Sequence, residues 1–71
     1  MHDRLRAKPP TTDTEAWTEA TVLTVDQTQS GHVVTVDGPD GVVEVTLEGA
    51  LFDLFSSRVD GDVVGSPCWY R

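Results

Sequence analysis

Positive charge is scarce in this chain, which has one lysine and lacks isoleucine and asparagine altogether. Its 71 residues include five Lys and Arg against twelve Asp and Glu, a formal net charge of −7. Arg4, Arg6 and Lys8 account for three of the five cations, so residues 9–71 hold eleven acidic and two basic side chains, a charge of −9. Such a surface repels the phosphate backbone that ordinary nucleic-acid-binding proteins neutralise. The composition therefore disfavours nucleic-acid binding and names no other partner.

Cysteine is nearly absent as well. Cys68 is the only one, so an internal disulfide is impossible and the small secreted class is disfavoured. A domain of this length buries only roughly 60 % of the surface of its unfolded chain and is marginally stable alone. We therefore expect self-association or docking onto a larger partner.

Long apolar runs are missing too. No stretch approaches the ~20 residues needed to span a bilayer. The start MHDRLRAKPP lacks the hydrophobic segment of a signal peptide. These features predict a cytoplasmic protein with no membrane partner.

Metal ligands and catalytic groups are equally sparse. The candidate ligands His2, His32 and Cys68 stand in no Cys-x-x-Cys or His-x-x-x-His pattern. A Cys68–His32 dyad stays open, although no nucleophile elbow or Gly-rich phosphate loop presents it. A barrel this small is also expected to have little room for a pocket of several hundred cubic ångströms. We predict a protein that is not an enzyme, with no catalytic residues, metal or cofactor.

The chain divides into an arm and one domain. Residues 1–14 include the pair Pro9-Pro10 and the polar run Thr11-Thr12-Asp13-Thr14, which cannot offset its ordering entropy by burial. We predict a flexible, disordered arm over residues 1–14 and a small β-barrel domain over residues 15–71.

Alternating apolar and polar residues predict strands over 20–26, 32–36 and 42–48. The segment Asp37-Gly38-Pro39-Asp40-Gly41 between the last two predicts a tight hairpin with at least one glycine at positive φ. After Gly49 the apolar residues follow helical spacing, which predicts a short helix that places two phenylalanines on the open end of a curled sheet. A short fourth strand is expected over 62–64, and a final edge strand over 68–71. The predicted interior consists of Leu23, Val25, Val34, Val36, Val43, Val45, Leu47, Leu51, Leu54, Phe55 and Val63.

This order of elements, with Gly61-Asp62-Val63-Val64 after the helix, resembles the S1 and initiation-factor-one type of OB domain over residues 20–64. An SH3-like barrel fits almost as well. We predict a mainly all-β fold: a five-stranded, mostly antiparallel small barrel, OB-like or SH3-like, with one short helix. The OB resemblance implies single-strand binding by aromatic platforms and a basic groove, but the second and third strands here carry Val, Thr and Glu.

The whole chain also resembles short acidic proteins of haloarchaea, a likeness that carries no assigned activity. In molar salt the Debye length falls to about 3 Å, so carboxylates repel one another little. Two interpretations of the acidity remain open, namely adaptation to salt and a binding feature.

Trp, Tyr and Arg, which are enriched in binding hot spots, stand together at the C-terminal end of the sequence. We predict a partner-binding patch of Trp17, Trp69, Tyr70 and Arg71. The alternative is that Trp69 covers an open barrel edge while Tyr70 and Arg71 are exposed. The main hypothesis is a non-enzymatic interaction module that forms a homo-oligomer or binds a protein partner. The second is an OB-type nucleic-acid or ribosome-associated protein that uses Arg4, Arg6 and Lys8.

Overall fold

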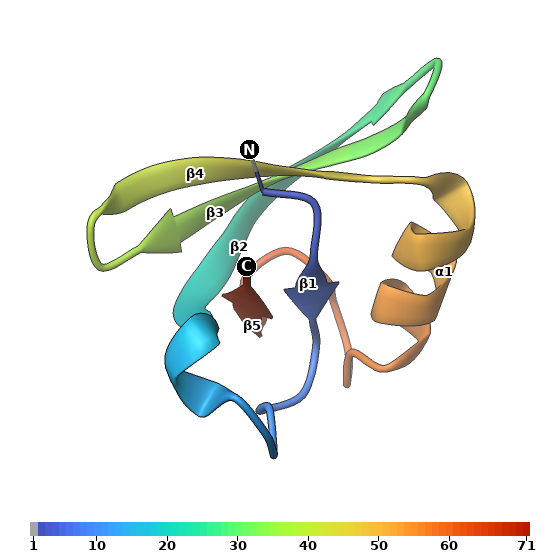
Figure 1. Cartoon of the computed structure of the whole chain (residues 1–71). Coiled ribbons are helices and arrows are strands. Elements are labelled where there is room, and N and C mark those ends of the chain that lie inside the picture. The colour runs from blue at the N-terminus through green and yellow to red at the C-terminus, as the bar shows by residue number, and fades with distance from the viewer. Residues whose placement is uncertain (1) are drawn as a thin grey trace.

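The computed structural model describes residues 2–71, which form a curled five-stranded antiparallel sheet, a half-barrel, with one α-helix beside it (Figure 1). This confirms the predicted class of a small, mainly β barrel with one short helix. The order of the strands in the sheet is β1-β5-β2-β3-β4. The elements are β1 (Leu5–Arg6), the 3₁₀ turn η1 (Thr14–Ala16), β2 (Thr18–Thr28), β3 (Gly31–Gly38), β4 (Gly41–Leu47), α1 (Gly49–Ser57) and β5 (Pro67–Tyr70).

The meander β2-β3-β4 follows the local sequence signals. Its two hairpins pair Thr28 with Gly31 and Gly38 with Gly41, so each connection is a two-residue turn. Gly31 and Gly41 have φ of 146° and 119°, which confirms the glycine predicted at positive φ in the second hairpin. At Gly31 a Cβ atom would lie 2.2 Å from the carbonyl oxygen of Leu47, so only glycine fits there.

Strand β2 belongs to both halves of the sheet. Its first residues pair with β5 and its later ones with β3, and the register shifts between Val22 and Thr24. The extra residue at this bulge reverses which side chains face inward. Val22 is therefore buried at 1 % exposure, whereas Leu23, predicted in the core, is 40 % exposed.

Residues 2–14 do not form the predicted disordered arm. Leu5 and Arg6 form β1, which pairs with Tyr70 and Trp69 of β5. Main-chain pairing holds this segment, and only Leu5 and Ala7 pack their apolar side chains, partly buried, against the core, so the low hydrophobicity of the segment did not indicate a strand. The pairing also makes β5 an internal strand rather than the predicted edge, and residues 62–64 form a bend instead of a strand.

One bridge links the two edges of the sheet. His2 pairs in parallel with Val45 of β4, and the amide of Thr46 donates to the His2 carbonyl oxygen at 3.2 Å. His2, which precedes β1 in the chain, therefore lies beside β4, at the opposite edge of the sheet from β1.

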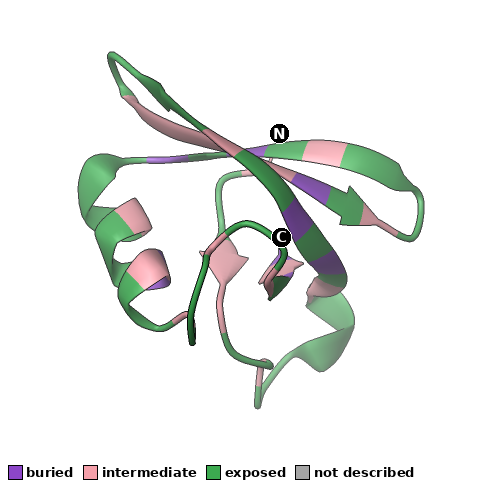
Figure 2. Ribbon diagram, turned by 180° about the vertical axis from the view of Figure 1, so that it is seen from behind, coloured by how far each residue is buried: buried purple, intermediate pink, exposed green. Residues whose placement is uncertain are grey.

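The core lies on the concave side of the sheet and is closed by α1, which packs against β3 and β4 (Figure 2). Phe55 of α1 is buried and Phe52 stacks on His32 with ring centroids 4.0 Å apart, so both phenylalanines cover the sheet as predicted. Leu51 and Leu54 were predicted inside, yet each is 47 % exposed. No helix in residues 2–71 is long and apolar enough to cross a membrane. The buried residues are Ala20, Val22, Val34, Val36, Val45, Leu47, Phe55, Cys68 and Tyr70.

Candidate functional site

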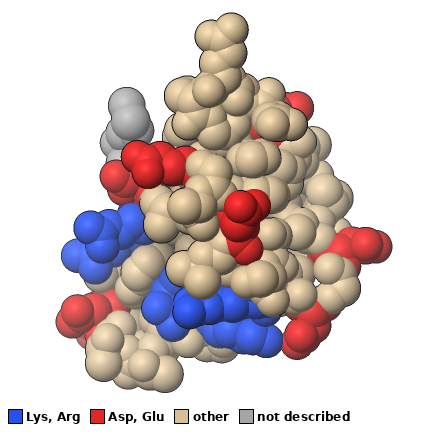
Figure 3. Space-filling view, turned by 90° about the vertical axis from the view of Figure 1, so that its right-hand side faces the viewer, with Lys and Arg blue, Asp and Glu red and all other residues tan. Residues whose placement is uncertain are grey.

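The N-terminal cations are part of the folded protein and lie near basic residues from distant parts of the chain. The amide of Arg71, just after β5, donates to the carbonyl oxygen of Arg4 at 3.0 Å. Arg4 and Arg6 line the same cavity as Arg58, which caps the C-terminal end of α1. Figure 3 shows Lys and Arg side chains gathered in neighbouring groups on one face, with Asp and Glu around them. An acidic protein thus carries a local basic region.

The arginines of this region are not neutralised by nearby carboxylates. Within residues 2–71 the one ion pair joins Lys8 Nζ to Asp60 Oδ2 at 3.1 Å, and the Asp60 side chain is 96 % exposed. A pair so exposed contributes little stability. Among the residues that the structure describes, no Asp or Glu oxygen lies within 4.0 Å of the side-chain nitrogens of Arg4, Arg6, Arg58 or Arg71. Their charges are available to an external anion.

Arginine and tryptophan share the outer surface of the sheet beside β1. The guanidinium carbons of Arg6 and Arg71 lie 5.7 Å and 6.0 Å from the centre of the Trp17 ring, within the range of cation–π attraction. Trp69 is the register partner of Arg6, and partners across antiparallel strands project from the same face. Both tryptophans are half-buried. We call this surface, Arg6, Trp17, Trp69 and Arg71, the Arg–Trp face.

Tyr70 does not belong to the predicted partner-binding patch. It is 6 % exposed, its ring lies edge-on to His2 with centroids 4.9 Å apart, and a Cβ on Gly38 would come within 3.0 Å of its hydroxyl. Alternation along β5 turns Cys68 and Tyr70 inward, and hence Trp69 outward. The alternative, in which Trp69 covers an open barrel edge, also placed Tyr70 on the surface, and the 6 % exposure of Tyr70 contradicts that part of it.

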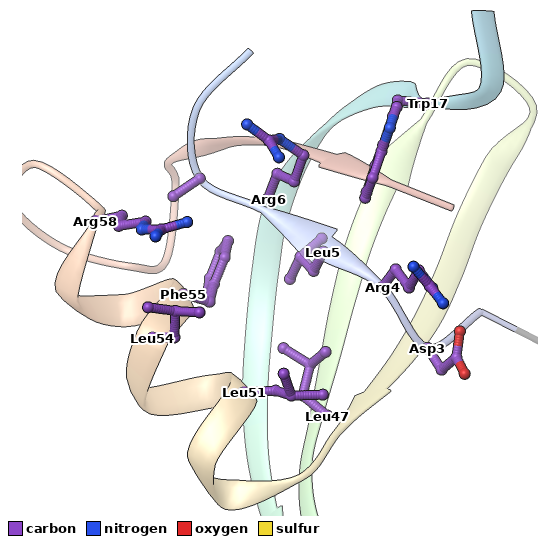
Figure 4. Close-up of a pocket in the computed structure, with 11 residues that line it drawn as sticks. Asp3, Arg4, Leu5, Arg6, Trp17, Leu47, Leu51, Leu54, Phe55 and Arg58 are labelled. Atoms are coloured by element: carbon purple, nitrogen blue, oxygen red, sulfur yellow. The ribbon is translucent and has the colours of Figure 1, made fainter. Parts of the chain in front are cut away.

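A cavity of about 570 Å³ lies between α1 and β1 (Figure 4). The expectation that a barrel this small has little room for a pocket of several hundred cubic ångströms is wrong, because this cavity opens between the helix and the N-terminal strand. Phe55 and the exposed Leu51 and Leu54 enter it from α1. Its lining comprises Asp3, Arg4, Leu5, Arg6, Ala7, Trp17, Leu47, Leu51, Leu54, Phe55 and Arg58, and we call it the α1–β1 cavity.

The structure does not bring the Cys68–His32 dyad together. Cys68 pairs with Ala20 of β2 and His32 pairs with Gln27, so their partners lie seven positions apart along that strand. Burial raises the pKa of the Cys68 thiol to about 11, which keeps it protonated and weakly nucleophilic at neutral pH. No group of three or more His, Cys, Asp or Glu side chains in residues 2–71 is placed to hold a metal ion.

Arg58 is the site residue that sequence reasoning missed. It stood at the end of a predicted helix, and nothing local indicated that this end would lie beside residues 4–7. The helical spacing of Leu51 and Leu54 was a usable signal, but it was assigned to the core. Recognition of β1 would have corrected both interpretations.

Comparison with known proteins identifies a family without assigning an activity. No curated protein and no solved structure shows a significant match. A model described as a family of unknown function, DUF7861, matches residues 1–71, and the chain therefore belongs to that family.

Proposed function

We propose that this protein is a non-enzymatic interaction module that binds an acidic protein partner through the Arg–Trp face. The observation that carries the proposal is that the guanidinium carbons of Arg6 and Arg71 lie 5.7 Å and 6.0 Å from the centre of the Trp17 ring, and that neither arginine pairs with a carboxylate within residues 2–71. Arginine and tryptophan are the residue types most enriched in binding hot spots. A partner with surface carboxylates would pair with the guanidiniums and cover the two indole rings.

The distribution of charge favours a different, acidic protein as the partner over self-association in an arbitrary orientation. The protein carries −7 overall, so two copies repel each other except where one presents its basic region. A heterologous partner whose carboxylates face the basic region, and whose remaining surface is not acidic, meets no such restriction. A specific homo-oligomer would have to place an acidic segment of one copy on the Arg–Trp face of the next.

The experiment is affinity capture of the tagged protein from native high-salt lysate, with and without nuclease, with the wild type compared to Trp69→Ala. Trp69 is half-buried on the outer face, so its loss should spare the fold and reduce partner capture at least about tenfold. Leu23→Ala is the matched control, because Leu23 is also partly exposed and lies outside the face. Equal capture by the wild type and Trp69→Ala would refute the proposal, and sedimentation of the purified protein tests self-association.

A second candidate is nucleic-acid binding, favoured by the gathering of basic residues beside a tryptophan. Cations on a surface with an aromatic ring are what single strands bind, through phosphates and stacked bases. With five cations in the chain, the affinity for a single strand should fall with log salt at a slope no steeper than about 3 to 4.

A labelled single-stranded oligonucleotide separates the two candidates. If nucleic acid is the ligand, the oligonucleotide should shift in a gel, and Arg4→Ala, Arg6→Ala and Lys8→Ala together should weaken the shift. The interaction module should give no shift with either protein. A shift that survives the triple substitution would point to the remaining arginines or to Trp69.

A further inference from the structure

The α1–β1 cavity has two chemically different ends. In Figure 4 the guanidinium groups of Arg6 and Arg58 lie at one end, and they come from β1 and from the C-terminal end of α1. Below them in this view lie the aliphatic and aromatic side chains of Leu5, Leu51 and Phe55. A ligand beneath these two arginines would therefore meet cations on one side and hydrocarbon on the other, while Arg4 and Asp3 line the far side of the cavity.

The cationic end favours a carboxylate or a phosphate. Neither Arg6 nor Arg58 has an Asp or Glu oxygen within 4.0 Å among residues 2–71. The one acidic side chain of the lining is Asp3, which lies beside Arg4 and away from these two arginines in Figure 4. Guanidinium groups bind planar carboxylate and phosphate oxygens in pairs of hydrogen bonds.

The cavity as a whole is large enough to hold a small molecule, and its helix side is apolar. Leu51 and Leu54 are each 47 % exposed although they belong to the packed helix, so they are not needed to fill the core. The volume of about 570 Å³ lies in the range of roughly 300–1,000 Å³ that is typical of ligand pockets. Such pockets combine a mainly apolar wall with a few polar groups that fix the orientation of the ligand.

We propose that the α1–β1 cavity binds a small amphipathic anion, whose carboxylate or phosphate head group pairs with Arg6 and Arg58 and whose aliphatic body packs on Leu51, Leu54 and Phe55. This site goes beyond the proposed function, because it lies between the helix and β1 rather than on the outer face of the sheet. Arg6 and Trp17 are shared between the two, whereas Arg58 and Leu54 belong to the cavity alone.

The test uses octanoate and octyl phosphate as probes. Trp17 lines the cavity, so Trp69→Phe, which leaves Trp17 as the sole tryptophan, gives a fluorescence readout of its occupancy. Both probes should bind with saturation. Octanol, acetate and inorganic phosphate, which each lack one half of the amphiphile, should bind at least about tenfold more weakly. Equal binding of octanol and octanoate would overturn the anionic part of the proposal.

Matched variants locate the site. Arg58→Gln and Leu54→Asp should each weaken octanoate binding about tenfold or more. Val64→Asp places the same carboxylate on a side chain that is 56 % exposed elsewhere, so it should retain wild-type affinity within about twofold. Circular dichroism checks that each variant is folded. Retained binding in both cavity variants would overturn the proposal.

Vesicles that contain phosphatidylglycerol distinguish a lipid from a free amphiphile as the source of the head group. Cosedimentation that is competed by octanoate and lost in Leu54→Asp would assign a lipid to the cavity. Octanoate binding without cosedimentation would assign a free amphiphile. Cosedimentation without octanoate binding would overturn the cavity proposal.

Partner capture that is lost in Trp69→Ala but kept in Arg58→Gln would show that the Arg–Trp face works independently of the cavity.

Discussion

The meander β2-β3-β4 and the terminal half formed by β1, β5 and the start of β2 are built by different kinds of interaction. In the meander, neighbouring strands are joined by two-residue turns, and each turn is followed by a glycine at positive φ. In the terminal half, β1 and β5 come from opposite ends of the chain, and Leu5 pairs with Tyr70. One half is specified by local sequence and the other by contacts between distant segments.

The two halves also differ in charge and in exposed aromatic rings. The meander and its turns carry acidic side chains and no Lys or Arg, while both tryptophans and four of the five cations lie in or beside the terminal strands. The pairing of β1 with β5 therefore creates the candidate binding surface as well as completing the sheet. The least locally specified part of the fold is the part on which both proposals depend.

Tyr70 provides the strongest way to break the terminal half. Tyr70→Ala should lower the free energy of unfolding by roughly 3–5 kcal/mol, because a large buried side chain leaves a cavity beneath β1 and β5. A domain this small should then be largely unfolded, as measured by circular dichroism and chemical denaturation.

Tyr70→Phe and Trp69→Ala serve as controls for that loss. The first keeps the buried ring, and the second removes a side chain from the outer face, so each should cost far less than Tyr70→Ala. If Trp69→Ala were instead the more damaging change, the assignment of inward and outward faces along β5 would be wrong.

Gly31 offers the corresponding test in the meander. Gly31→Ala should cost roughly 2–4 kcal/mol, since positive φ strains an L residue and its Cβ would meet the Leu47 carbonyl oxygen. Gly41 also has a positive φ, but no atom lies within 4 Å of the place where a Cβ would stand. Gly41→Ala should therefore lower the free energy of unfolding by only about 1 kcal/mol. Gly49 has neither a positive φ nor a neighbouring atom that a Cβ would meet, so Gly49→Ala should leave the stability of α1 unchanged or raise it slightly. Denaturation midpoints that do not follow this order would contradict the turn geometry.

The contrast between halves explains how much of the fold could be predicted from the sequence. The three long strands, the glycine turn and the helix follow from alternation, turn chemistry and helical spacing, all of which act within about ten residues. The bulge after Val22 could not be found this way, because an extra residue reverses inward and outward positions without any change in composition. Strand β1 could not be predicted from its own sequence, because its two residues are held in the sheet by main-chain pairing with β5 at the other end of the chain.

The candidate site was only partly predictable for the same reason. Trp17, Trp69 and Arg71 were identified from residue type alone, and the structure places them in one half of the sheet. Arg4, Arg6 and Lys8 were recognised as possible contacts but assigned to a flexible arm. That Arg58 faces the same cavity depends on where α1 packs, which no local pattern specifies.

The pH dependence of stability tests whether the Cys68 thiol is buried where β5 pairs with β2. The folded-state pKa of this thiol, about 11, exceeds the ordinary value of 9.0, so the folded state holds the thiol proton more tightly. The resulting stability is fully present below about pH 9 and is lost as pH rises towards 11, a change of roughly 3 kcal/mol at about 1.4 kcal/mol per pH unit. Denaturation at several pH values should show this slope in the wild type. Cys68→Ala should lack it, and identical slopes would contradict the burial of the thiol.

Salt should change the stability less per side chain than any of the substitutions above. Its effect should depend on the carboxylates of the acidic meander rather than on those of the basic terminal half. Between roughly 0.1 M and 2 M KCl, screening of carboxylate repulsion should raise the melting temperature by several degrees, equal to about 1 kcal/mol for a domain of this size. Asp37→Asn with Asp40→Asn removes charge from the meander and should reduce this rise, whereas Asp60→Asn removes the partner of Lys8 and should not. A flat or falling melting temperature in the wild type would remove salt adaptation as the explanation of the net −7 charge. In that case we would interpret the acidity as a binding feature, because acidic side chains elsewhere on the surface repel anionic ligands and leave the Arg–Trp face as the place where they bind.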